Sequence, residues 1–244
     1  MSPGLADFRA NLLDAAGCAL ERAHPDFVST FSQVLEATQD PDQAHAAVAS
    51  IATDQGFARW RPLLVSLYDV ELQMARVRSA LKLHGTRAEA SILTMWTMNE
   101  GSWVDYHQAA WTLYIDGMLE RVRKLLRQSC RGLIRPFSQD WRATEKRLCS
   151  VPDDLLGRLA SMRDPIAHGG GPVEALAQER LIEGQAVLGI WFDALYLLEK
   201  QRDSQSKWQE HMHKFTLLTF AWIEQTLDEL NQAVPWKDVR ASWC

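Results

Sequence analysis

The 244-residue sequence has no apolar run approaching the roughly 18 to 20 residues that a membrane-spanning helix requires. Its first residues contain an early acidic side chain, Asp7, and no long apolar stretch, so they are unlike a signal peptide. Both absences exclude the membrane and secretory classes at the level of sequence. We therefore expect a cytoplasmic protein that has no contact with a membrane.

Cysteine is scarce and irregularly spaced. The four cysteines form no C-x-x-C pair and no regular framework: Cys18, Cys130, Cys149 and Cys244. This pattern argues against a disulfide scaffold and lacks the spacing of a cysteine-based zinc site. The expectation is that they are free thiols, buried or without a role, in a reducing compartment.

The sequence motifs of several common enzyme classes are also missing. There is no G-x-S-x-G nucleophile elbow, no phosphate-binding loop of the G-x-x-x-x-G-K-[ST] type and no G-x-G-x-x-G fingerprint. His211 and His213 are two residues apart, a spacing that points them in different directions on a helix. We therefore expect no metal and no cofactor.

Strict alternation of apolar and polar residues, which is typical of strands, is absent, whereas apolar residues recur every three or four positions. This spacing predicts long helices over residues 63–83, 104–133, 173–200 and 208–234. Helices of this length bury their apolar stripes by packing against one another. The sequence therefore predicts an all-α protein, an up-and-down helical bundle, with a hydrophobic content of 47% to supply its core.

Prolines and glycines divide the chain into shorter helices before Gly56 and longer ones after it. We interpret residues 1–56 as an N-terminal helical extension and residues 57–244 as the bundle. The alternative, in which the N-terminal helices pack onto the same bundle, stays open. Trp103 and Trp111 lie on one helical face with His107 between them, and we expect them to be packing residues because aromatic side chains bury large areas.

Positive charge is locally concentrated in a chain that is acidic overall, with a formal net charge of -5. Nine basic residues lie between residues 121 and 147, against only Asp140 and Glu145: Arg121, Arg123, Lys124, Arg127, Arg131, Arg135, Arg142, Lys146 and Arg147. Such a strip would give sequence-independent, salt-sensitive affinity for a phosphate backbone. The alternative is a solvated face paired with acidic helices elsewhere.

Four of these residues are the candidate RNA-binding set, because they fall together on one helical face. Arg123, Arg127 and Arg131 recur every fourth residue, and Lys124 lies within a turn of them. The strip precedes the most informative motif of the sequence, which favours a role in binding RNA.

That motif lies in residues 155–172, which read LLGRLASMRDPIAHGGGP. A short amphipathic helix is expected to run to Met162, with Asp153 and Asp154 favourably placed near its N-terminus. Pro165 is expected to break it, because proline lacks a backbone donor and restricts the residue before it. The break would let the side chains of Arg163 and His168 converge beside the glycines.

An arginine and a histidine suit chemistry at a phosphate. Histidine exchanges a proton near neutral pH, and arginine presents a permanently charged planar fork to phosphate oxygens. RNA supplies its own nucleophile in the 2′-hydroxyl, so cleavage needs no metal where a base and a cation are well placed. A two-fold dimer would bring two such pairs around one phosphate.

The run from Arg163 to His168, with four residues between the two, resembles the R-x4-6-H signature of the HEPN family, and RDPIAHGG is close to the form that many members show. More loosely, the resemblance covers residues 57 to 234. HEPN proteins are helical bundles, usually dimeric, and many are metal-independent endoribonucleases in toxin–antitoxin, abortive-infection and CRISPR-linked defence. The resemblance implies that Arg163 and His168 are catalytic.

The same resemblance suggests supporting residues and one departure. Asp164 matches the polar position after the arginine, where asparagine is commoner in the family. Asp116 and Glu120 are candidates for the further polar residue on the preceding long helix. One subfamily has a modifiable tyrosine two residues after the histidine, and Gly170 stands there in this chain.

The function that we expect is therefore cleavage of RNA by a homodimeric toxin or antiviral defence effector, with a cognate antitoxin or defence protein as a further partner. A non-catalytic HEPN-like binding or scaffold module, or an antitoxin, is the first alternative. An unrelated helical bundle, in which Arg163 only caps a helix, is the second.

Overall fold

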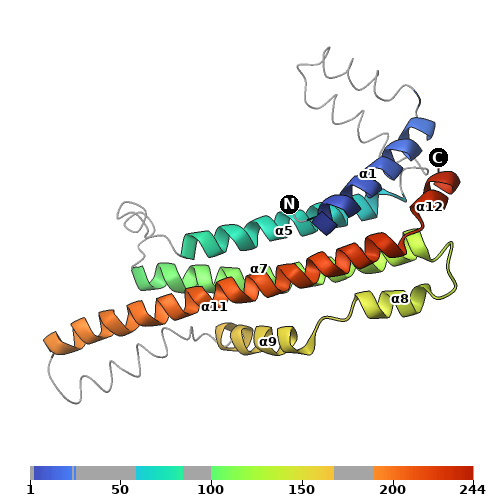
Figure 1. Cartoon of the computed structure of the whole chain (residues 1–244). Coiled ribbons are helices and arrows are strands. Elements are labelled where there is room, and N and C mark those ends of the chain that lie inside the picture. Colours follow the sequence, from blue (N-terminus) through green and yellow to red (C-terminus); the bar gives the residue numbers. More distant parts are fainter. Residues whose placement is uncertain (1–2, 24, 26–58, 85–99, 168–189, 244) are drawn as a thin grey trace, which may run out of the picture. The chain divides into compact units, whose positions relative to one another are not determined.

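The computed structural model describes residues 3–23, 25, 59–84, 100–167 and 190–243. Helices account for most of these residues, and no strand occurs among them (Figure 1). The prediction of an all-α fold is therefore confirmed for the described part of the chain. None of the described helices is long and apolar enough to cross a membrane.

The helices follow one another in the order α1 (Pro3–Ala23), α5 (Arg61–His84), α7 (Glu100–Ser129), α8 (Trp141–Leu148), α9 (Asp153–Ala167), α11 (Ile190–Ala233) and α12 (Trp236–Trp243). A π-helical turn, η1 (Cys130–Ile134), directly continues α7. The backbone N–H of Arg135 closes it by donating to the carbonyl of Cys130 at 2.8 Å. Pro136 follows, which has no N–H with which to extend the helix.

The chain divides into two compact units, each built from segments that are distant in sequence. The first unit contains Met1–Val70, Arg121–Ser150 and Trp222–Cys244, and the second contains Glu71–Glu120 and Val151–Ala221. The division passes through α5, α7 and α11, so each of these helices contributes residues to both units.

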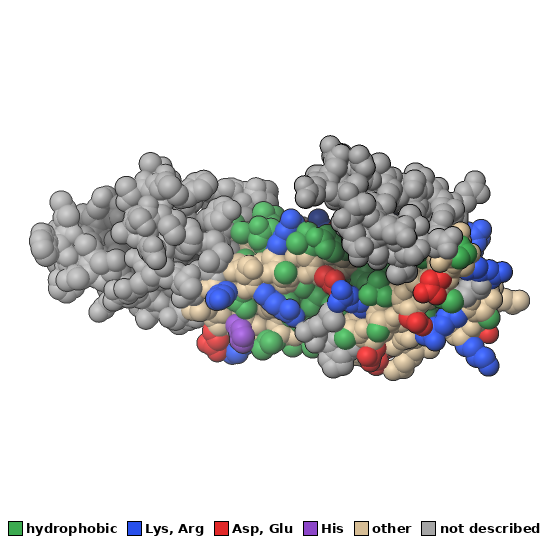
Figure 2. Space-filling model, turned by 90° about the horizontal axis from the view of Figure 1, so that it is seen from above, with side chains coloured by type: hydrophobic (Ala, Val, Ile, Leu, Met, Phe, Trp, Pro, Cys, Tyr) green, Lys and Arg blue, Asp and Glu red, His purple; other side chains and the backbone are tan. Residues whose placement is uncertain are grey.

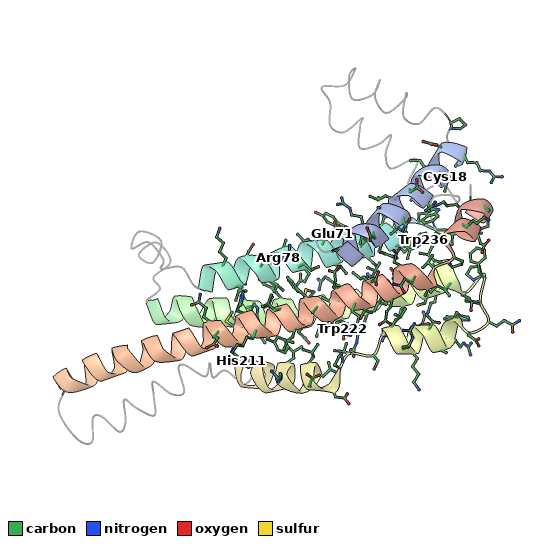
Figure 3. All side chains as sticks on the ribbon, in the orientation of Figure 1. Cys18, Glu71, Arg78, His211, Trp222 and Trp236 are labelled. Carbon is green, nitrogen blue, oxygen red and sulfur yellow. The ribbon has the colours of Figure 1, made fainter. Side chains whose placement is uncertain are left out.

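In the first unit, α1 packs against α12. The rings of Phe8 and Trp236 are 5.9 Å apart and tilted by 58°, and Phe8 is fully buried (Figure 3). The Trp236 Nε1–H donates to the side-chain oxygen of Asn231 at 2.9 Å, which satisfies its polar atom. Helix α1 falls within the predicted N-terminal extension. The predicted boundary near residue 56 lies outside the described residues and stays a prediction.

The core of the second unit is centred on Trp111 of α7. This side chain is fully buried, its Nε1–H donates to the Thr216 hydroxyl at 3.0 Å, and its ring meets Phe215 edge-on at 5.9 Å. Gln73 of α5 is also buried, and its side-chain amide donates to the Tyr114 carbonyl at 3.1 Å. The prediction that Trp111 is a packing residue is confirmed, whereas the Trp103 side chain lies outside the described ones.

Some large apolar side chains are instead exposed, and Figure 2 shows hydrophobic surface interspersed with charged side chains on one face. The most exposed are Tyr68, Leu113, Leu217, Val65, Leu218 and Leu13. Single apolar side chains at a surface are common in soluble folds, and these ones identify no partner.

Two of the predicted helix segments agree with the observed helix bounds, and the predicted break between the last two segments is wrong. Residues 63–83 correspond to α5, and residues 104–133 correspond to α7 with η1. The segments 173–200 and 208–234 were predicted separately, but α11 runs without interruption from Ile190 to Ala233. Residues 201–207 contain no proline or glycine, and their polar side chains cost a helix only a few tenths of a kcal/mol each. Residues 173–189 lie outside the described ones.

Substitution of Gly4 by alanine is expected to destabilise the protein by about 1–3 kcal/mol, the usual cost of overpacking. A Cβ atom at Gly4 would lie 2.8 Å from the carbonyl oxygen of Glu224 on α11, closer than side chains tolerate. The Gly4 backbone N–H also donates to the Glu224 side chain. The free energy of unfolding, measured by urea denaturation, checks this expectation.

Gly157→Ala is the matched control, because a Cβ at this exposed position in α9 would meet no atom within 4 Å. There, alanine should stabilise the protein by about 0.5–1 kcal/mol through its higher helix propensity. Equal effects at the two positions would contradict the close approach of α1 to α11.

Candidate active-site motif and basic face

The motif that contains Arg163 lies at the C-terminal end of α9. This helix starts after Pro152 with Asp153 and Asp154 in its first turn, as predicted, and buries Leu155 and Leu159 one turn apart. Its backbone continues through Arg163, Asp164 and Pro165 to Ala167.

The predicted end of this helix at Met162 is therefore wrong. Proline removes one backbone hydrogen bond and crowds the preceding turn. A helix can nevertheless continue beyond a proline, with a kink, when only a short stretch of helix follows it. Only Ile166 and Ala167 follow Pro165 in α9, so few helical hydrogen bonds depend on the disrupted turn.

We expected a helix break at Pro165 to bring Arg163 and His168 together, but α9 continues through Pro165. Positions five apart in a continuous helix differ by about 140° around its axis, so a helical backbone alone does not place them on one face. His168 lies outside the described residues, as do the side chains of Arg163 and Asp164. The distance between the arginine and histidine side chains stays a prediction.

The two supporting candidates on α7 lie one helical turn apart. The Asp116 side chain is half-buried and Glu120 is exposed, and both belong to the second unit. Their assignment to the catalytic site depends on the position of His168 and therefore stays a prediction too.

The basic strip lies in the first unit, on the end of α7, η1 and α8. Of the four predicted RNA-binding residues, Lys124, Arg127 and Arg131 are exposed, whereas Arg123 is half-buried. The Arg123 carbonyl accepts a long hydrogen bond from the Cys149 thiol at 3.9 Å, which places it beside the chain that follows α8. Three of the four predicted residues therefore face solvent.

Helix α8 adds further exposed cations to this surface, because it packs against η1 (Figure 1). We call the exposed basic residues of this region the basic face: Lys124, Arg127, Arg131, Arg135, Arg142, Lys146 and Arg147. The sequence reasoning recognised the strip but did not include its α8 part in the binding set, because the packing of α8 against η1 was not visible in the residue spacing.

Within the described ranges, acidic side chains pair with two members of the basic face. Glu145 pairs with Arg131 at 3.4 Å, and Glu229 of α11 pairs with Arg147. No carboxylate in the described ranges forms an ion pair with the remaining members of the face, which include Arg135, Arg142 and Lys146. Pairing with acidic helices, the alternative considered from sequence, thus accounts for two of the seven cations within the described part of the chain.

Trp141, the first residue of α8, lies among these cations and was missed by the sequence reasoning, which treated tryptophans as core. Its side chain is half-buried. The guanidinium carbon of Arg135 and that of Arg142 each lie 5.5 Å from the centre of the Trp141 rings. The sequence does contain a signal for this position. Trp141 directly precedes Arg142, follows Arg135 by six residues and lies outside the long apolar stripes.

Two thiols lie beneath the basic face. Cys130 is buried and Cys149 is half-buried, and both are free, as expected. Burial raises the pKa of Cys130 to about 12. Burial also raises the pKa of Cys149, although the guanidinium of Arg127 opposes this shift. Neither thiol is therefore an activated nucleophile at neutral pH.

The expectation of free thiols is wrong for Cys18. This residue lies on α1 (Figure 3) and is disulfide-bonded. The sequence reasoning excluded a disulfide framework from irregular spacing, but a single bond requires only that two cysteines meet in the fold. Disulfides are uncommon in reducing compartments, so cysteine usage no longer supports a cytoplasmic location.

Replacement of Cys130 by alanine is expected to make the free energy of unfolding fall less steeply as the pH rises above 9. The unfolded thiol ionises near its ordinary pKa of 9.0, whereas the folded thiol keeps its proton up to about pH 12. The unfolded state therefore binds fewer protons between these values, and the free energy of unfolding falls as the pH rises through this window. Urea denaturation at pH 8 and pH 10 measures the difference.

Cys149→Ala is the control. It should remove a smaller part of the pH dependence, because Cys149 is only half-buried and the guanidinium of Arg127 opposes the rise in its pKa. An identical pH dependence in wild type and Cys130→Ala would contradict the buried position of this thiol.

Among the described residues, no group of three or more His, Cys, Asp or Glu side chains could hold a metal ion. His211 and His213 are both exposed on α11. His213 lines an open pocket with Leu81, Gln209 and Glu210, but Glu210 is already paired with Lys214 at 2.6 Å.

Comparisons of the chain with models of known protein families, with curated proteins and with solved structures find no match.

Proposed function

We propose that this protein is a metal-independent endoribonuclease of the HEPN type, acting as a toxin or defence effector. The observation that carries the proposal is the run RDPIAHGG, in which four residues separate Arg163 and His168 in the sequence. Arg163 belongs to the last turns of α9, in an all-helical setting. The exposed basic face supports it by supplying a surface suited to a phosphate backbone.

The proposed reaction is attack of the RNA 2′-hydroxyl on the adjacent phosphorus. A base removes the 2′-hydroxyl proton, the bond to the 5′-oxygen breaks, and an acid protonates that leaving oxygen. The products are a 2′,3′-cyclic phosphate and a 5′-hydroxyl, and the cleavage step consumes no water. His168 provides one of the two proton transfers, and Arg163 binds the phosphate oxygens and stabilises the charge of the transition state.

A homodimer supplies the second proton-transfer group. One histidine cannot be both deprotonated base and protonated acid at the start of a single step, so a second copy of the chain provides the other. Asp164 brings a negative charge next to the phosphate and would orient Arg163. Asp116 and Glu120 are the proposed supporting residues on α7.

The basic face supplies affinity rather than chemistry. Lys124, Arg127 and Arg131 are exposed cations that release counterions from RNA on binding, and Arg123 lies next to them. A toxin with such a surface would be restrained by a protein partner that covers either the motif or the basic face.

Incubation of purified protein with labelled single-stranded RNA in EDTA tests the proposed chemistry. We expect cleavage of the RNA and none of the same sequence carrying 2′-O-methyl groups, which lack the attacking hydroxyl. Cleavage that requires Mg²⁺, or equal cleavage of the 2′-O-methyl strand, would refute the mechanism.

A further inference from the structure

The basic face has one feature that phosphate binding does not explain, namely the tryptophan at its centre. Trp141 keeps a partly exposed aromatic ring between α8 and the end of η1, although tryptophan buries more area than other residues when it is in a core. Phe137, four residues earlier in the sequence, is 37% exposed.

The backbone holds this arrangement in place. The amides of Phe137 and Ser138 both donate to the Ile134 carbonyl, at 2.9 and 3.0 Å, and the Ser138 hydroxyl accepts from the Asp140 amide at 3.3 Å. This turn fixes the short chain between η1 and α8. It therefore holds Arg135, at the end of η1, close to Trp141, at the start of α8.

The two arginines lie over the Trp141 ring, so guanidinium groups cover part of its surface. Each guanidinium carbon lies 5.5 Å from the centre of the Trp141 rings, within the range of a cation–π contact. No ion pair with a described carboxylate occupies Arg135 or Arg142. Guanidinium groups that are free of carboxylates and ordered on an indole can stack on a base and bind a phosphate at the same time.

Further exposed cations lie close in sequence to this cluster, on η1 and α8. Lys146 follows Arg142 by four residues, so both lie on the same face of α8. Arg131, on η1, lies four residues before Arg135 and would exchange its ion pair with Glu145 for a phosphate. The combination of a stacking surface with cations on either side is the usual composition of a site for single-stranded nucleic acid.

We propose that Arg135, Trp141 and Arg142 form a stacking site for an unpaired base of single-stranded RNA, with Arg131 and Lys146 binding the neighbouring phosphates. The choice of RNA rests on the proposed function. The choice of a single strand rests on the aromatic group, because a base within a duplex keeps both faces stacked on its neighbours and cannot reach the indole. The site would position the substrate and would have no part in bond cleavage.

Fluorescence anisotropy of labelled oligoadenylate tests this site in the full chain carrying His168→Ala, so that cleavage does not disturb the measurement. Adding Trp141→Ala should raise the Kd by about 5- to 100-fold, the loss expected from one base–aromatic stack. Trp141→Phe should retain most of the affinity. The slope of log Kd against log salt should not change, because the indole carries no charge.

Lys124→Gln is the matched control on the same face and outside the stacking cluster. It should weaken binding modestly and reduce the salt slope by about 1, for single strand and duplex alike. Affinity for the oligoadenylate–oligouridylate duplex should be unaffected by Trp141→Ala. This readout separates a ligand-binding role from a structural one, since a collapse of α8 would weaken both kinds of binding.

Unchanged affinity of Trp141→Ala for oligoadenylate would overturn the proposal, as would an equal loss for single strand and duplex. Binding to phosphatidylserine vesicles that depends on Trp141, without binding to oligoadenylate, would also overturn it and assign the face to a membrane. Failure of this stacking-site proposal can be distinguished from failure of the proposed ribonuclease function. A chain that never cleaves RNA can still show Trp141-dependent binding, and a cleaving chain can lack it.

Discussion

Substitution of His168 by alanine is expected to lower the rate of RNA cleavage by about 10²- to 10⁴-fold, the contribution of a positioned general acid or base. Histidine suits this role because the ordinary pKa of its side chain lies near neutral pH, and alanine has no group that exchanges a proton. Single-turnover cleavage of a labelled RNA in EDTA measures the effect. Far-UV circular dichroism of the variant should match that of the wild type.

His213→Ala is the matched control, since His213 is exposed on α11 and has no role in the proposed reaction. It should cleave at the wild-type rate. Arg163→Lys should fall between wild type and His168→Ala, because lysine keeps the charge but loses the planar fork that binds two phosphate oxygens. A His168→Ala variant that cleaves as fast as His213→Ala would exclude His168 from catalysis.

The replacement of Trp111 by alanine is expected to destabilise the second unit by about 3–5 kcal/mol, the range for removal of a large aromatic side chain from a core. Trp111 is fully buried, contacts Phe215 edge-on and donates to Thr216 at 3.0 Å. Alanine would leave a cavity and would remove the donor to the Thr216 hydroxyl, which keeps only its own hydrogen bond to the Met212 carbonyl at 2.7 Å. Urea denaturation followed by circular dichroism gives the change in the free energy of unfolding.

Leu113→Ala provides the comparison, since this side chain on the same helix is 57% exposed. Its substitution should change the free energy of unfolding by no more than about 0.5 kcal/mol. Thr216→Val should cost about 1–3 kcal/mol, because it leaves the buried Trp111 Nε1–H without an acceptor. A cost for Trp111→Ala as small as that of Leu113→Ala would contradict the packing of α7 against α11.

The apolar spacing was sufficient to predict the all-α class and the approximate bounds of α5 and α7. Each has a proline or glycine near its start, and each repeats its apolar residues at three and four. The same reasoning divided α11 incorrectly, because a stretch without apolar spacing was interpreted as a break although it lacks any helix-breaking residue. It also ended α9 too early, since Pro165 near the end of a helix removes little of it.

The basic surface was predictable in composition but not in detail. Charge density located the strip, whereas the half-buried position of Arg123 depends on the path of the chain around Cys149. The π-helical geometry of η1 and its contact with α8 arise from tertiary packing, which leaves no periodic signal in sequence. Trp141 and the disulfide at Cys18 were missed for the same reason: both depend on which segments meet.

The catalytic assignment depends on the sequence run at the end of α9, so the most direct test addresses the chemistry of that run. Wild type and His168→Ala should be incubated in parallel with one defined RNA in EDTA, and the product ends identified by mass spectrometry. We predict 2′,3′-cyclic phosphate and 5′-hydroxyl ends from the wild type alone. The same products from both proteins, or 5′-phosphate ends from the wild type, would contradict the proposal.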